Sequence, residues 1–233
     1  MKIPADARES ARAVLARSGE RLTEPEAKQL LSCFGIRVPR EGIAMSASAT
    51  AALARKIGFP VALKVVSPDV RDKRGAGALA LGVKNAAEVR VAFARVLQHA
   101  RKHDARARLE GVLVSEMVPR GIDVALSLTR ARGRGEIAFG LGGLLGVAAG
   151  GLALRAPPIG PGEAKAMLRE VAGVARVLQS HGDAAAITDL LERFGRLAAD
   201  LEEIVAFDLD VHALPRGKGY VVVDAWATRR PQR

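Results

Sequence analysis

Hydrophobic and polar residues follow two periods along this 233-residue chain. Apolar positions three and four residues apart are typical of amphipathic helices, and short apolar or alternating runs between turn residues are typical of strands. The helical period predicts helices at residues 7–18, 22–35, 46–58, 85–103, 160–171 and 186–201. The strand pattern predicts strands at 36–39, 59–66, 78–83, 110–118, 123–131, 136–143, 204–214 and 219–227. Alternating helices and strands predict an α/β or α+β fold.

Two of the predicted helices carry recognisable boundary residues. Thr23 stands before Pro25 and Glu26, as an N-cap stands before a first helical turn, and Gly35 follows the last apolar position. Asn85 stands at the start of the 85–103 helix in the same way. These boundaries make the two helices the best-defined elements of the prediction.

Composition narrows the class of protein. Hydrophobic residues make up 49% of the chain and aromatic residues only 3%, so we expect a core of Ala, Val, Leu and Ile. No apolar run approaches the ~18 residues of a membrane-spanning helix, and the polar, Ala- and Arg-rich N-terminal segment lacks the apolar region of a secretory signal. The single cysteine, Cys33, excludes an intramolecular disulfide. We therefore expect a cytoplasmic protein that does not enter a membrane.

The chain is strongly basic, with 36 Lys and Arg residues, 25 Asp and Glu residues and a formal net charge of +11. A basic surface can bind nucleic acid through phosphate contacts. The Arg residues are dispersed, however, and few aromatic side chains are available to stack on bases. We therefore do not expect a nucleic-acid partner, and the charge suits smaller anionic ligands such as nucleotides or CoA equally well.

Candidate chemistry is concentrated in the stretch KVVSPDVRDKRGAGALALGV, residues 64–83. A phosphate chain needs a fixed cation and backbone N–H groups that no Cβ obstructs. Lys64 supplies a cation at the end of an apolar run, and Gly75, Gly77 and Gly82 supply a pliable loop. The alternatives are a lysine that snorkels from an edge strand and glycines that only mark turns.

Five segments, taken in order, resemble the ATP-grasp domain of the NDP-forming acyl-CoA synthetases, and in particular the separate β subunit of ADP-forming acetyl-CoA synthetase. They are LTEPEAKQLLSCFGIRVP, GFPVALKVVSPDV, EGVLVSEMVPRGIDV, FGLGGLLG and GYVVVDA, and they extend from about residue 22 to residue 228. No single segment is specific, but the ordered set is. The resemblance implies an ATP-grasp fold with two subdomains around a nucleotide cleft. It places an N-terminal helix at 1–21, a small subdomain at 22–110 and a large subdomain at 111–233.

The resemblance also implies ATP or ADP as cofactor, with Mg²⁺ or another divalent metal. By resemblance, Lys64 and the glycine loop contact the phosphates, Glu116 contacts the adenine and Asp123 contacts the ribose. Asp224 matches a metal-binding carboxylate. Solvated strand-end carboxylates are the alternative for the acidic residues. The cofactor-binding candidates are Lys64, Gly75, Gly77, Glu116 and Asp123.

The chain departs from the family at the positions implied in phosphoryl transfer. Asp72 stands where the family has the His that carries the phosphoryl group, so the catalytic residue is open: Asp72 is either a substitute acceptor or a paired loop charge. Val147 replaces a Glu, and Gly150 and Gly151 replace a Lys-Asp pair.

One expected metal ligand also differs. In LDVHAL, Asp210 is retained, but His212 replaces an Asn that helps to hold magnesium. Imidazole is a poor ligand for Mg²⁺, so His212 either favours a softer metal or is a polar strand residue.

Two functions therefore compete. The first is an enzyme subunit that binds nucleotide and acts with a CoA-binding, Rossmann-type α subunit, with phosphoryl transfer impaired by the substitutions. The second is a non-catalytic module that senses nucleotide or regulates a partner. Whether the chain is an enzyme is left open at this point.

Overall fold

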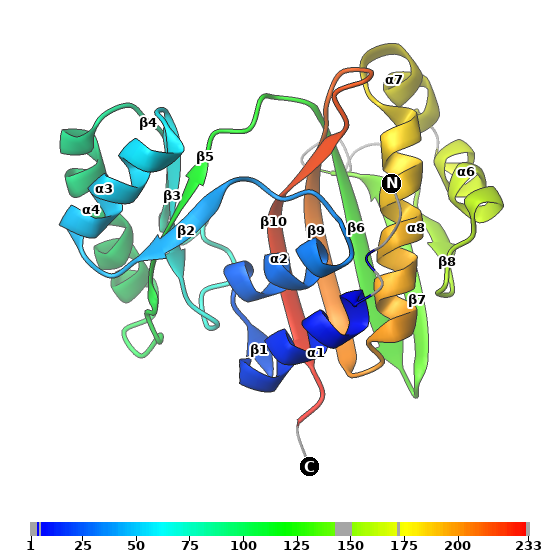
Figure 1. The fold of residues 1–233 in the computed structure, drawn as a ribbon, viewed down its shortest axis with the longest axis horizontal. Helices are drawn as coiled ribbons and strands as arrows, with labels where there is room; N and C mark the ends of the chain where they lie inside the picture. Colours follow the sequence, from blue (N-terminus) through cyan, green and yellow to red (C-terminus); the bar gives the residue numbers. More distant parts are fainter. Residues whose placement is uncertain (1–3, 5, 143–150, 172, 232–233) are drawn as a thin grey trace. The chain divides into compact units, whose positions relative to one another are not determined.

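The structure, a computed structural model, describes residues 4, 6–142, 151–171 and 173–231. It contains two units, each with its own sheet, and each is described here by itself (Figure 1). Unit 1 comprises Met1–Leu22, Glu26–Val38 and Pro119–Arg233. Unit 2 comprises Thr23–Pro25 and Pro39–Val118.

Unit 2 is a four-stranded antiparallel sheet in the order β2-β5-β3-β4, with two helices on one face (Figure 1). Its elements are β2 (Glu41–Ala44), α3 (Ala47–Ile57), β3 (Val61–Val66), β4 (Leu79–Val83), α4 (Ala86–His103) and β5 (Gly111–Glu116). Small and branched apolar residues such as Val61, Val89 and Val114 fill the space between sheet and helices. The core is thus built from the aliphatic residues that the composition indicated.

Unit 1 is a larger antiparallel sheet in the order β1-β10-β9-β6-β7-β8. Its strands are β1 (Arg21–Leu22), β6 (Ile122–Ala131), β7 (Arg134–Leu141), β8 (Ala153–Arg155), β9 (Ile204–Ala213) and β10 (Tyr220–Arg229). Its helices are α1 (Ala7–Arg17), α2 (Glu24–Cys33), α6 (Pro161–Glu170), α7 (Val174–His181) and α8 (Ala184–Asp200). Helix α8 runs along the sheet (Figure 1), and its Phe194 meets Phe207 of β9 edge to face, with ring centroids 5.6 Å apart.

Most of the predicted elements are confirmed. The six predicted helices correspond to α1, α2, α3, α4, α6 and α8. Asn85 caps α4, because its side chain accepts hydrogen bonds from the backbone N–H groups of Ala87 and Glu88. Within the described residues, no helix is both long enough and apolar enough to cross a membrane.

The strand predicted at 36–39 is wrong, and the strand of this region is β2 at Glu41–Ala44. The Ile36 N–H donates to the Leu31 carbonyl and so closes the end of α2, and Pro39 has no N–H to contribute to a ladder. The elements β1, β8 and α7 were not predicted. Two of them are strands of two or three residues, too short to show a period.

The predicted ranges 1–21, 22–110 and 111–233 differ from the two units in two respects. Strand β5 pairs with β2 and β3, so it lies in the sheet of unit 2 although it begins at Gly111. The buried residues of α1 and most of α2 contribute to the core of unit 1. As functional subdomains, the three ranges stay a prediction.

Candidate functional site

Lys64 lies on β3, all six residues of which are buried. Its ammonium donates to Oε1 of Glu24 at 2.6 Å, and its side chain is 10% exposed. Strand β3 lies between β5 and β4, so the alternative of a lysine on an edge strand is wrong. A buried ammonium needs an ionic partner, and the carboxylate at the first residue of α2 supplies one.

Lys73 reaches the same carboxylate from the loop that follows β3. Its ammonium lies 3.2 Å from Oε2 of Glu24, and its side chain is 8% exposed. Glu24 therefore contacts two buried cations at once. Sequence analysis did not single out Glu24, because an acidic residue in the first turn of a helix is usually a solvated partner of the helix dipole.

The loop between β3 and β4 is a hydrogen-bonded turn. The Ala76 N–H donates to the Asp72 carbonyl at 3.0 Å, and the Ala78 N–H donates to the Lys73 carbonyl at 2.8 Å. The Asp72 side chain folds back over the turn, where Oδ1 accepts from the Gly75 N–H at 2.7 Å. Asp72 is exposed, but one of its carboxylate oxygens accepts a backbone hydrogen bond.

Gly75 and Gly77 have different roles in the geometry of this turn. A Cβ at position 75 would lie 2.2 Å from Oδ2 of Asp72. At position 77 φ is +66°, and a Cβ would lie 2.7 Å from Nδ1 of His99. The positive φ and the close approach of His99 favour glycine at position 77, whereas at position 75 a side chain would displace the exposed Asp72 side chain. Whether they also lie over phosphates stays a prediction.

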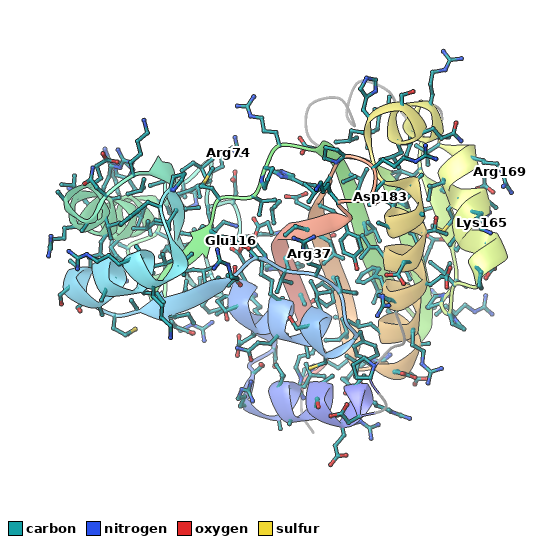
Figure 2. All side chains as sticks on the ribbon, turned by 45° about the horizontal axis from the view of Figure 1, so that its top comes forward. Arg37, Arg74, Glu116, Lys165, Arg169 and Asp183 are labelled. Atoms are coloured by element: carbon teal, nitrogen blue, oxygen red, sulfur yellow. The ribbon has the colours of Figure 1, made fainter. Side chains whose placement is uncertain are left out.

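Glu116, labelled in Figure 2, ends β5, and Arg40 holds its carboxylate. Oε1 of Glu116 accepts from the Arg40 backbone N–H at 2.9 Å, and Oε2 accepts from Nε of Arg40 at 2.7 Å. The Glu116 N–H in turn donates to the Arg40 carbonyl at 2.9 Å. The carboxylate is therefore fixed in orientation at the end of its strand, and its predicted contact with adenine stays a prediction.

In unit 1, one face of the sheet is polar around β9. Phe207, Leu209, Val211 and Ala213 are buried, and the alternate residues Asp208, Asp210 and His212 point to the other face. Strand pairing places Asp224 of β10 opposite Asp210, and Asp123 of β6 opposite His212. Three of the predicted site residues, Asp123, His212 and Asp224, thus share one face of this sheet.

Asp224 reaches this face because of a β-bulge. Val222 pairs with Val211 and Asp224 pairs with Asp210, so Val223 is an extra residue on β10. Without it, the alternation of the strand would place Asp224 among the core residues. The pattern GYVVVDAWA gave no indication of the bulge.

The hairpin that carries these carboxylates is fixed at its turn. Oδ2 of Asp183 accepts from the backbone N–H groups of Gly217 and Gly219 at 2.8 Å and 3.0 Å. Arg37 donates to the Lys218 carbonyl at 3.0 Å, and Figure 2 labels both Asp183 and Arg37. Asp183 also caps α8, so one side chain ties the β9–β10 turn to the helix.

Both ring nitrogens of His212 have oxygen neighbours. Nε2 lies 3.3 Å from Oδ1 of Asp123, and Nδ1 lies 3.4 Å from the Pro119 carbonyl. A metal ligand needs a nitrogen lone pair, so His212 would have to give up one of these contacts to bind a metal. Among the described residues, no group of three or more His, Cys, Asp or Glu side chains is arranged to hold a metal ion.

The predicted site residues thus form two sets. Lys64, Asp72, Gly75, Gly77 and Glu116 lie in unit 2, and Asp123, His212 and Asp224 lie in unit 1. That the two sets meet at one nucleotide stays a prediction. Val147 and Gly150, two of the substituted positions, lie outside the described residues.

The chain is similar to known proteins of one family. The ATP-grasp domain family matches residues 13–228. The β subunit of acetate–CoA ligase (ADP-forming) I from Pyrococcus furiosus is 33% identical over 194 residues, which cover 81% of this chain and 84% of that subunit. The longer acetate–CoA ligase (ADP-forming) I of Archaeoglobus fulgidus is 36% identical over 90% of this chain, but the match covers only 31% of that enzyme.

A solved structure shows the same fold. The acetyl-coenzyme A synthetase 1 of Ca. Korarchaeum cryptofilum, in complex with coenzyme A and Ca-AMPCP, superposes with a TM-score of 0.87 and 32% identity, covering 96% of this chain and 100% of that chain. The protein therefore belongs to the ATP-grasp family, among the β subunits of ADP-forming acetate–CoA ligases. The predicted fold and family are confirmed.

Proposed function

We propose that this chain is the nucleotide-binding subunit of an ADP-forming acyl-CoA synthetase and that its phosphoryl transfer is impaired. The observation that carries the proposal is Lys64, a buried lysine whose ammonium is held by Glu24 beside the glycine turn of the next loop. A pre-positioned cation suits the phosphates of ATP or ADP. The Korarchaeum relative has been solved with the nucleotide analogue Mg-AMPPCP, which is consistent with this assignment.

Asp210 and Asp224 fit a divalent metal. They are directly opposite each other on neighbouring strands, which brings two carboxylates side by side on one face of the sheet. Mg²⁺ is commonly held by one or two carboxylates together with substrate phosphates. The metal would neutralise phosphate charge, and the two carboxylates would orient it. His212 is a polar strand residue in this proposal rather than a metal ligand.

Impaired phosphoryl transfer follows from the position of Asp72. In the Korarchaeum relative, a phosphohistidine segment points towards the nucleotide-binding site. By resemblance to the family, Asp72 stands at the position of a phosphoryl-carrying His, and its Oδ1 accepts a hydrogen bond from the Gly75 N–H. A carboxylate engaged in this way is a weaker nucleophile towards the γ-phosphorus of ATP. We therefore expect nucleotide binding without a stable phosphoenzyme.

The proposed partner is a CoA-binding, Rossmann-type α subunit. Relatives of this length are β subunits, and the Archaeoglobus enzyme carries the equivalent of this chain as about a third of a longer polypeptide. The remaining two thirds of the Archaeoglobus polypeptide would correspond to such a partner. A non-catalytic nucleotide sensor is the second candidate, and the replacement of the phosphoryl-accepting His by Asp72 favours it.

Calorimetry tests nucleotide binding. Lys64→Ala should weaken ATP binding by about 1.5–3 kcal/mol, the scale of a hydrogen bond to a charged group. The exposed Lys84 of the same unit offers a control, Lys84→Ala, which should leave the affinity unchanged. Equal affinities for wild type and Lys64→Ala would show that the nucleotide binds elsewhere.

Labelling with γ-³²P-ATP then tests whether phosphoryl transfer is impaired. We expect no stable label on the protein. If Asp72 has taken over as acceptor, its carboxylate attacks the γ-phosphorus, ADP leaves, and the acyl phosphate formed is labile to hydroxylamine and absent from Asp72→Asn. Robust labelling with turnover after addition of an α subunit would make this an ordinary synthetase subunit.

A further inference from the structure

The Glu24 carboxylate contacts the ammonium groups of two lysines that lie on different segments of unit 2. Oε1 is 2.6 Å from Nζ of Lys64 on β3, and Oε2 is 3.2 Å from Nζ of Lys73 on the following loop. The Glu24 side chain is only 1% exposed. Because water is largely excluded, these contacts are stronger than those of a surface ion pair, and they respond more steeply to a change in either partner.

The position of Lys73 depends on a turn rather than on a regular element. The Ala78 N–H donates to the Lys73 carbonyl, and the Ala76 N–H donates to the Asp72 carbonyl. A change in this turn therefore moves the Lys73 ammonium relative to Glu24. Strand β3, by contrast, is paired on both sides, so the backbone of Lys64 is fixed.

We propose that Glu24 and Lys73 are positioning residues for Lys64, and that through them the turn at residues 72–78 sets the affinity of the site for nucleotide phosphates. This inference rests on the proposed function of Lys64. Glu24 orients the ammonium, but its negative charge also competes with phosphate for it. Lys73 occupies the second oxygen of Glu24 and adds a positive charge, which weakens that competition.

The exposed Arg74 provides a matched control for Lys73. Both are cations on the same turn. Lys73 is buried against Glu24, and Arg74, labelled in Figure 2, is exposed. Lys73→Met and Arg74→Met remove the same charge from neighbouring positions. Methionine is an apolar substitute of similar length, and the contact of Lys64 with Glu24 is retained in both variants. Any difference between the variants therefore reports the contact with Glu24.

Calorimetric titration of the full chain with ATP and with adenosine tests the proposal. Lys73→Met should weaken ATP binding about tenfold, a coupling of ordinary size between residues in one ion-pair network. Adenosine, which has no phosphates, should bind with unchanged affinity. Lys73→Arg keeps the positive charge and should retain most of the wild-type affinity for ATP. Arg74→Met should change that affinity less than about twofold. Equal losses for the two methionine variants, or equal losses for ATP and adenosine, would overturn the proposal.

Amide hydrogen exchange provides a test that needs no nucleotide. In Lys64→Met, one of the two lysine contacts of Glu24 is removed, so the contact with Lys73 should strengthen. The turn should then be held more tightly, and the Ala76 and Ala78 amides should exchange several-fold more slowly. Amides in the middle of α4 serve as the internal control. If the wild type bound no ATP, the proposed function would be wrong. The exchange rates would still show whether Glu24 and the turn at residues 72–78 are coupled. Unchanged exchange at the turn would overturn it.

Discussion

Each unit buries a charged cluster, and the two clusters are built differently. In unit 1, the Arg193 guanidinium donates two hydrogen bonds to Asp189, at 2.7 Å and 3.0 Å, and a third to the Phe34 carbonyl at 3.1 Å. The arginine side chain is 2% exposed, but its partner Asp189 is 44% exposed. In unit 2 the buried carboxylate of Glu24 is the centre, and two lysines surround it.

The chemistry of the cations in the two clusters indicates different roles for Arg193 and for the two lysines. A guanidinium is a rigid fork whose donors match fixed acceptors, so Arg193 ties α8 to the end of α2. An ammonium is a point charge on a flexible stem, and its partner can be exchanged for another anion. Two ammonium groups around one carboxylate therefore suit a site that receives phosphate, whereas the arginine cluster suits a permanent connection.

The largest effect on stability is expected at Glu24. Glu24→Gln removes the carboxylate that both lysines contact, and it should lower the free energy of unfolding by roughly 3–5 kcal/mol, the usual cost of breaking a buried ion pair. Denaturant unfolding measures the change. Glu9→Gln, at an exposed residue of α1, should stay within about 0.5 kcal/mol of wild type. If the two variants were equally stable, the Glu24 cluster would not contribute to the stability of the fold.

A somewhat smaller loss is expected at Arg193. Arg193→Met removes the donor to the buried Phe34 carbonyl, but Asp189 is partly exposed and regains water, so we expect a loss of about 2–4 kcal/mol. Arg196→Met is the control on the same helix, since Arg196 pairs with Asp200 at 2.7 Å with its side chain 60% exposed. That variant should cost less than about 1 kcal/mol. Equal costs would contradict the buried role of Arg193.

The free energy of unfolding should depend on pH through Tyr220, which lies near Arg193 and Asp189. Burial, followed by the charge of Asp189, raises the pKa of Tyr220 from 10.0 to about 12. Below pH 10 the phenol is neutral in both the folded and the unfolded protein, so its contribution to stability is constant. Between pH 10 and 12 the unfolded state ionises first, so stability should fall by roughly 2–3 kcal/mol in total.

The chain contains a single tyrosine, so the phenolate absorbance reports Tyr220 alone. Its midpoint in the folded protein should lie near pH 12. Because Arg193 lowers the pKa of Tyr220, Arg193→Met should move the midpoint upward. A midpoint near pH 10 in the folded protein would mean that Tyr220 is not buried as described.

Helices and strands could be predicted from the sequence where the residues that define them lie close together along the chain. The period of 85–103 and its Asn85 cap lie within a few residues of each other, and α4 begins one residue after that cap. The ordered segments also sufficed for the ATP-grasp family. The Glu24 cluster was not predictable, because its three residues are distant in sequence and a charge pattern does not reveal which lysines are buried.

The bulge at Val223 has a consequence for how substitutions in this family are compared. Before it, even-numbered residues of β10, such as Tyr220 and Val222, face the core; after it, odd-numbered residues such as Ala225 do. This switch in parity allows an aspartate to stand opposite Asp210. A relative that lacked one residue here would retain its aspartate in the sequence and yet turn it towards the core. Insertions and deletions at this position therefore matter as much as the identity of the aspartate itself.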